Sequence, residues 1–190
     1  MSARVLGIDP GLTRCGVGIV EVARNKSVKL VTVEVIRTSP EMELPKRILV
    51  IANRIEQIIT EFQPTSMALE RVFAQQNLRT VMGVAQISGV VLFASARHNL
   101  PIGLHTPTEV KAALSGYGAA DKKQLGAMVA KVLGLAEIPK PADASDALAL
   151  AICHGWKGNL FRESSKTELT PAQSKWHAAL RDAEKARKRP

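Results

Sequence analysis

The alternation of apolar and polar residues predicts three strands at the start of the chain. Residues 5–8 form a short apolar run that ends at Asp9 and at the turn residues 10–11. Residues 15–22 and 28–37 then alternate between two faces, as expected for strands. Because the connections between these runs are short, we expect the three strands to form an antiparallel meander.

The period changes after the third strand. Apolar residues recur every three or four positions over residues 44–62, which predicts an amphipathic helix of about five turns. A second short apolar run, residues 66–70, follows and ends at Glu70. Two strands joined by a helix in one sheet run parallel. If this strand lies beside the first, Asp9 and Glu70 emerge at the same edge of the sheet.

The rest of the chain predicts one more strand and four more helices. Residues 77–99 are apolar nearly all round, so this helix is either enclosed in the core or covered by another subunit. Residues 102–105 form a fifth strand, and Thr106-Pro107-Thr108-Glu109 matches a helix-starting capping box. Helices at 122–133 and 142–154 complete an α/β fold, in which helices flank a five-stranded mixed sheet.

Length and charge indicate one basic domain with a tail. The 190 residues carry a formal net charge of +9, which points to a polyanionic partner, nucleic acid before anionic membrane. Residues 156–190 hold much of this basic excess, so we expect a folded domain at 1–155 and a basic tail at 156–190.

Compartment is predicted from what the chain lacks. The longest uncharged stretch, residues 80–96, is shorter than a membrane span and contains polar residues. The first strand begins almost at once, which leaves no room for a signal peptide. Cys15 and Cys153 lie too far apart to suggest a zinc site or a disulfide framework. We therefore expect a cytoplasmic protein.

Four acidic residues form the candidate site. Asp143 and Asp146 are three residues apart, so they share one face near the start of the last helix, and Asp9 and Glu70 end two strands. Clustered carboxylates repel one another unless a cation lies among them, and oxygen ligands favour Mg²⁺ or Mn²⁺. Such ions can assist phosphodiester hydrolysis. Two simpler interpretations remain open: Asp9 as a turn residue and Asp143 as a helix N-cap.

Five motifs, taken in order, resemble the RuvC family of bacterial Holliday junction resolvases. They are residues 6–11, 69–73, 110–111, 116–122 and 142–149. The resemblance implies an RNase H-like fold, with residues 1–155 as the nuclease domain. It also implies that Asp9, Glu70, Asp143 and Asp146 are catalytic, metal-binding acids that use Mg²⁺, with Mn²⁺ able to substitute.

The resemblance also implies which residues bind DNA and which partner proteins act with the chain. Phe73 would stack on or wedge between bases, and Lys111 and Lys122 would serve DNA binding and catalysis; taken alone, these residues suggest a core aromatic and two surface charges. A homodimer would make paired symmetric nicks in a four-way DNA junction and leave 5′-phosphate and 3′-hydroxyl ends. The RuvA junction-binding protein and the RuvB branch-migration motor would be its partners in recombination and repair.

Three other functions compete with this hypothesis. An actin-like ATPase also opens with a Gly-x-Asp-x-Gly turn, although 190 residues are short for its duplicated core. A non-catalytic DNA-binding relative would be expected to lack one of the four acids. A nuclease of related fold that cuts RNA is the third alternative, and the motifs around Phe73, Lys111 and Lys122 argue against it.

Overall fold

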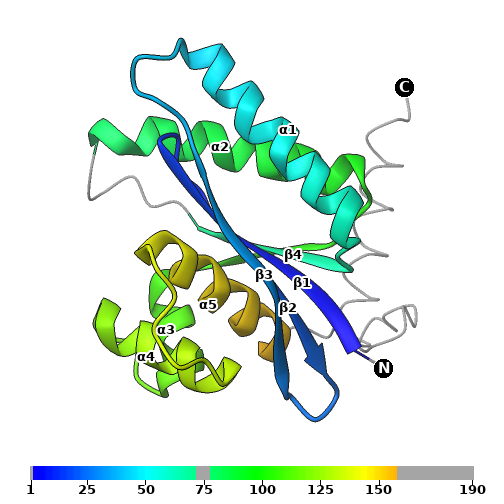
Figure 1. Cartoon of the computed structure of the whole chain (residues 1–190), viewed down its shortest axis with the longest axis vertical. Coiled ribbons are helices and arrows are strands. Elements are labelled where there is room, and N and C mark those ends of the chain that lie inside the picture. The colour runs from blue at the N-terminus through cyan, green and yellow to red at the C-terminus, as the bar shows by residue number, and fades with distance from the viewer. Residues whose placement is uncertain (1, 72–77, 158–190) are drawn as a thin grey trace, which may run out of the picture. The chain divides into compact units, whose positions relative to one another are not determined.

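A computed structural model describes residues 2–71 and 78–157, in which helices cover both faces of one sheet (Figure 1). The strands are β1 (Ser2–Asp9), β2 (Arg14–Ala23), β3 (Val28–Arg37), β4 (Ser66–Glu70) and β5 (Ile102–His105). The helices are α1 (Leu44–Phe62), α2 (Leu78–Arg97), α3 (Pro107–Ser115), α4 (Lys122–Leu133) and α5 (Ala142–Lys157).

The strands lie in the order β3-β2-β1-β4-β5. β1, β2 and β3 pair antiparallel, which confirms the predicted meander. β4 runs parallel to β1 and β5 runs parallel to β4, as the intervening helices predict. The carboxyl ends of β1, β4 and β5 therefore lie at one edge of the sheet.

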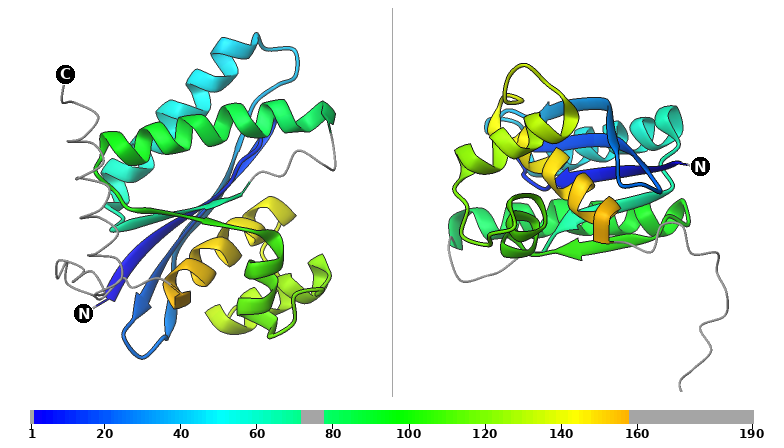
Figure 2. Two further views of the ribbon diagram at one scale, coloured as in Figure 1. Left: turned by 180° about the vertical axis from the view of Figure 1, so that it is seen from behind. Right: turned by 90° about the horizontal axis from the view of Figure 1, so that it is seen from below.

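Alternate residues of the central strands face two separate cores. Leu6 and Ile8 of β1 pack with α1 and α2 on one face, whereas Val5 packs with α3, α4 and α5 on the other. The left view in Figure 2 shows the same division, with α1 and α2 on one side of the sheet and α3, α4 and α5 on the other. The second core therefore lies beneath the helix that carries Asp143 and Asp146.

The helix boundaries agree closely with the sequence pattern. At the start of α3, the Thr106 hydroxyl accepts from the Glu109 amide at 3.1 Å, and the Glu109 carboxylate accepts from the Thr106 amide at 2.8 Å, which confirms the capping box. The last helix extends to Lys157, three residues beyond the expected end. Because residues 158–190 lie outside the described part, the boundary at 155 and the basic tail stay predictions.

The apolar helix α2 is buried on one side only. Ile87 and Val91 are fully buried against the sheet, while the side chains of Met82 and Phe93 are 64% and 62% exposed. In the described residues, no helix combines the length and the apolar character that crossing a bilayer requires. Within this chain, then, α2 is not enclosed on all sides, in contrast to one of the two expectations for it.

Candidate active site

The pairing of β1 with β4 places Asp9 and Glu70 side by side. Ile8 pairs with Leu69, so the two acids are the next residues on adjacent parallel strands. Side chains alternate between the two faces of a strand. Since Ile8 and Leu69 belong to the core under α1 and α2, both carboxylates point to the opposite face, where α5 lies.

Glycines let α5 approach this face unusually closely. A Cβ added to Gly7 of β1 would come within 2.2 Å of the Ala147 carbonyl oxygen, and one added to Gly16 of β2 would come within 2.0 Å of the Asp143 carbonyl oxygen. Any other residue at these positions would therefore push the helix away. The contact brings the first turns of α5, with Asp143 and Asp146, over the end of β1.

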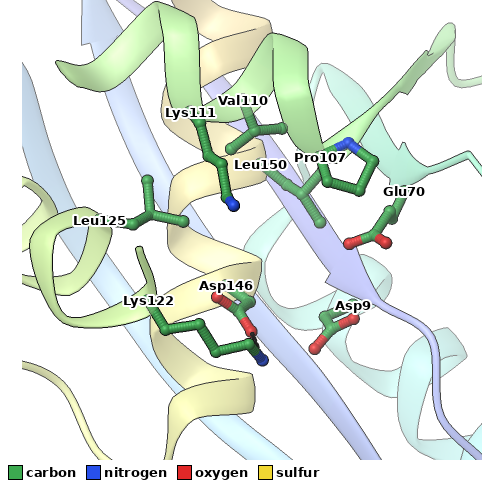
Figure 3. A pocket seen from close by; sticks show the side chains of 9 residues that line it. All are labelled: Asp9, Glu70, Pro107, Val110, Lys111, Lys122, Leu125, Asp146 and Leu150. Atoms are coloured by element: carbon green, nitrogen blue, oxygen red, sulfur yellow. Dashed lines mark hydrogen bonds and ion pairs between the residues drawn. The ribbon is translucent and has the colours of Figure 1, made fainter. Parts of the chain in front are cut away.

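Three of the four predicted acids line one cavity of about 270 Å³. Figure 3 shows Asp146 from α5 between Asp9 and Glu70 on one side and Lys111 and Lys122 on the other. The complete lining is Asp9, Glu70, Pro107, Val110, Lys111, Lys122, Leu125, Asp146 and Leu150. We call this cavity the acid pocket. Its apolar wall comes from α3, α4 and α5, and two of the wall residues, Leu125 and Leu150, lie outside the motifs that the sequence shows.

Burial and the repulsion of neighbouring carboxylates raise the pKa of Asp9 and Glu70. Burial, followed by the negative charges of Glu70, Asp146 and Asp143, raises the pKa of Asp9 to about 7. Burial and the charge of Asp146 likewise raise the pKa of Glu70. The nearby ammonium of Lys122 opposes both shifts. The pocket thus concentrates negative charge that a cation would stabilise.

Each acid of α5 forms an ion pair with a basic side chain. Lys122 Nζ lies 3.1 Å from Asp146 Oδ2, and this carboxylate raises the pKa of Lys122. Arg14 Nε lies 3.3 Å from Asp143 Oδ2. Asp143 lines a separate cavity and not the acid pocket, although its charge contributes to the raised pKa of Asp9. The sequence analysis did not single out Arg14. Its position shortly after the Asp9 turn is the signal that could have suggested a role at the site.

The position of Asp143 rules out the simpler role considered for it. α5 begins at Ala142, so Asp143 is the second helical residue and not the N-cap. Its carboxylate contacts Arg14 across the sheet edge. Phe73, the expected base-stacking residue, lies outside the described residues, so its role stays a prediction.

The donor set fits a hard divalent cation, although the acids are not gathered around one point. Within residues 2–71 and 78–157, no three Asp, Glu, His or Cys side chains converge closely enough to form a metal-binding group. Asp143 and Asp146 instead contact Arg14 and Lys122. All four candidate ligands are carboxylates, which suit Mg²⁺ or Mn²⁺. The raised pKa of Asp9 reflects its burial first and then the repulsion of the other carboxylates, which such an ion would offset.

Comparison with known proteins places this arrangement in context. The family model for crossover junction endodeoxyribonuclease RuvC matches residues 5–154. The protein of that description from Leifsonia xyli is 56% identical over 194 residues, covering 95% of this chain and 93% of the relative. A second, from Clavibacter sepedonicus, is 60% identical over 171 residues, covering 90% of this chain and 84% of the relative.

A solved structure has the same fold. T. thermophilus RuvC in complex with a Holliday junction substrate aligns with a TM-score of 0.76 at 36% identity, covering 80% of this chain and 92% of the other. The predicted fold class, an RNase H-like α/β fold with a five-stranded mixed sheet, is confirmed.

Proposed function

The chain belongs to the RuvC family of crossover junction endodeoxyribonucleases, and we propose how its acid pocket carries out the reaction of that family. The chain is an endonuclease of DNA recombination and repair that resolves four-way, or Holliday, junctions. The residues that perform the reaction are the subject of the proposal. Asp9, Glu70, Asp143 and Asp146 are the catalytic acids, and Lys111 and Lys122 bind the DNA backbone beside them.

The four acids hold the metal ions of the reaction, which we assign as Mg²⁺ with Mn²⁺ able to substitute. Asp9, Glu70 and Asp146 line one cavity. Burial and then the charges of Glu70, Asp146 and Asp143 raise the pKa of Asp9. Ions held by these acids would supply the charge that activates a water and stabilises the departing oxygen of the phosphodiester. Asp143 and Asp146 would hold the ions in place of their present partners, Arg14 and Lys122.

The lysines act on the substrate. Lys111 and Lys122 line the same cavity as the acids, on α3 and α4. Their ammonium groups balance the charge of the phosphate that enters the pocket, and Lys122 is able to follow it because its side chain is 76% exposed. Phe73 would stack on the bases at the junction centre. The products carry 5′-phosphate and 3′-hydroxyl ends, which a ligase can seal.

The active form is a homodimer with two-fold symmetry. A four-way junction is close to two-fold symmetric, so a dimer can present one acid pocket to each of two opposed strands. The exposed apolar side chains Met82, Leu92 and Phe93 on α2 supply a surface that a second copy would cover. RuvA and RuvB are the proposed partners. The cytoplasm is the proposed compartment, in keeping with the free thiols of Cys15 and Cys153.

A single observation supports the mechanism most strongly: Asp9, Glu70 and Asp146 line one cavity together with Lys111 and Lys122. The test incubates the purified protein with a mobile synthetic four-way junction, a linear duplex and an RNA–DNA hybrid, each with Mg²⁺ or with chelator. Asp146→Asn removes one acid. Glu61→Gln is the matched control, since Glu61 is exposed near the C-terminal end of α1 and does not line the pocket.

Paired symmetric nicks in the junction alone, dependent on Mg²⁺ and lost in Asp146→Asn but retained in Glu61→Gln, are the expected result. Tight junction binding without cutting would indicate a non-catalytic DNA-binding protein. Cutting of the hybrid in place of the junction would indicate a nuclease directed at RNA. Full activity of Asp146→Asn would remove Asp146 from the mechanism.

A further inference from the structure

Two adjoining cavities lie on the Asp143 side of the acid pocket. The first, of about 530 Å³, lies between the β1–β2 connection, the start of α1 and the first half of α2. The second, of about 580 Å³, lies between the β1–β2 connection and the end of β3. Thr13 and Arg14 line both. We call the combined depression the arginine groove, because Arg14, Arg37 and Arg47 line it.

The groove is strongly positive. Among the described residues that line it, the charged ones are three arginines and a single acid, Asp143. The N-cap residue of α1, Glu43, makes no side-chain capping bond, and the first turn of that helix contains no acid. The positive end of the dipole of α1 therefore lies where Leu44 lines the groove.

The folded chain holds these positive charges together at a cost. Arg14 and Arg37 are direct partners in the pairing of β2 with β3. Like charges placed opposite each other on adjacent strands destabilise a sheet. Among the described residues, no hydrogen bond or ion pair engages the exposed Arg37 side chain. Asp143 already balances the charge of Arg14, and an anion beside Arg37 would relieve the repulsion that remains.

Arg47 is positioned without being neutralised. Its Nε donates to the Thr38 hydroxyl at 2.9 Å, and its Nη2 donates to the Thr13 hydroxyl at 2.8 Å. Thr38 is buried and donates in turn to the Leu12 carbonyl. These partners are uncharged, so the guanidinium is held in a fixed place with its full charge available to a ligand.

Arg14 joins the groove to the acid pocket. Its Nε contacts Asp143, one of the proposed catalytic acids, while its side chain is 55% exposed. An anion bound to the three arginines would therefore lie next to the reacting phosphate. In a DNA strand, the anions next to the reacting phosphate are the neighbouring backbone phosphates. Arginine binds phosphates through paired N–H groups.

We propose that the arginine groove binds the backbone phosphates next to the one that is cut, on the Asp143 side of the acid pocket. The inference rests on the proposed function, because it takes the DNA strand in the acid pocket as given. Lys111 and Lys122 would then hold the strand from the Asp146 side, and the arginine groove would fix its direction through the site.

The test measures how junction affinity depends on salt, in chelator so that no cutting occurs. Removal of one phosphate-binding charge lowers the slope of log affinity against log salt by about 0.9. Arg37→Gln is the main variant, because in the described part of the chain the Arg37 side chain forms no bond that holds the fold. Arg37→Lys keeps the charge. Arg97→Gln is the matched control, since Arg97 is an exposed arginine at the far end of α2.

We expect Arg37→Gln to lower the slope by roughly the value for one phosphate, Arg37→Lys to restore it and Arg97→Gln to leave it unchanged. Arg47→Gln should lower it as well, with its melting temperature measured to confirm folding. Equal slopes for the wild type, Arg37→Gln and folded Arg47→Gln would overturn the groove as a phosphate site. Cleavage by the wild-type protein with Mg²⁺ is measured in parallel, so that failure of the proposed function is distinguished from failure of the groove.

Discussion

The backbone carbonyl of Asp143 lies directly over Gly16, so that a methyl group added to Gly16 would come within 2.0 Å of that oxygen. This contact links the β2 strand to the first turn of the helix that carries two of the four acids. A glycine at position 16 is thus required for the first turn of α5 to lie this close to the sheet.

Replacement of Gly16 by alanine should displace the start of α5. We expect Gly16→Ala to lower the free energy of unfolding by about 1–3 kcal/mol, because a well-packed contact must open. Junction cleavage should fall as well, since Asp143 and Asp146 move away from Asp9. Thermal melting and a cleavage assay measure the two effects. In Gly89→Ala, the added methyl meets no atom within 4 Å, so this variant should melt no lower than the wild type. A normal melting temperature for Gly16→Ala would contradict the close contact.

The raised pKa of Asp9 predicts a specific dependence of stability on pH. A carboxyl group whose pKa is higher in the folded state than in the unfolded state stabilises the fold most below its unfolded pKa, and this contribution is lost as pH rises. For Asp9 the loss should run from about pH 3.8 to about pH 7. It should reach up to about 4 kcal/mol in the absence of divalent cations.

The effect is isolated by comparing the free energy of unfolding of the wild type with that of Asp9→Asn. Both are measured by denaturant unfolding in chelator over this pH range. Relative to the variant, the wild type should lose stability as pH rises. A difference independent of pH would show that Asp9 titrates normally. Added Mg²⁺ should reduce the loss if the acids bind it.

Removal of one acid should stabilise the metal-free protein. The ion pair of Asp146 with the exposed Lys122 is worth little, whereas its repulsion with Asp9 and Glu70 acts in a partly buried site. In chelator, we expect Asp146→Asn to raise the melting temperature by roughly 2–4 °C, which corresponds to about 1 kcal/mol. An unchanged or lower value would mean that the contact with Lys122 outweighs the repulsion.

The proposed dimer surface can be tested by adding a charge to it. The Phe93 side chain is 62% exposed on α2, and burying a glutamate in its place against a second copy would leave an unpaired charge. Phe93→Glu should therefore sediment as a monomer at concentrations where the wild type is a dimer. Tyr117→Glu changes an aromatic residue of similar exposure outside α2 and should leave the dimer intact. Dimerisation of both variants would place the interface elsewhere.

Local sequence pattern was sufficient for the elements and for part of the site. The periods of apolar residues located the five strands of residues 2–71 and 78–157 and most of their helices, because side chains alternate along a strand and recur every three or four residues on a helix. The strand–helix–strand order also predicted that Asp9 and Glu70 lie at one edge, since such connections make the strands parallel. The capping box of α3 was also evident from the sequence, because its contacts join residues only three positions apart.

Tertiary structure alone decided how the site is closed. Gly7 and Gly16 determine how near α5 comes to the sheet, and the pairing of Arg14 with Asp143 joins residues 129 positions apart in the sequence. Neither contact can be predicted from a local pattern of residues. Each depends on how closely two elements pack, and the pattern within each element does not determine that distance. The sequence by itself therefore determined which acids could meet, and packing decided which of them share the pocket and which basic residues they contact.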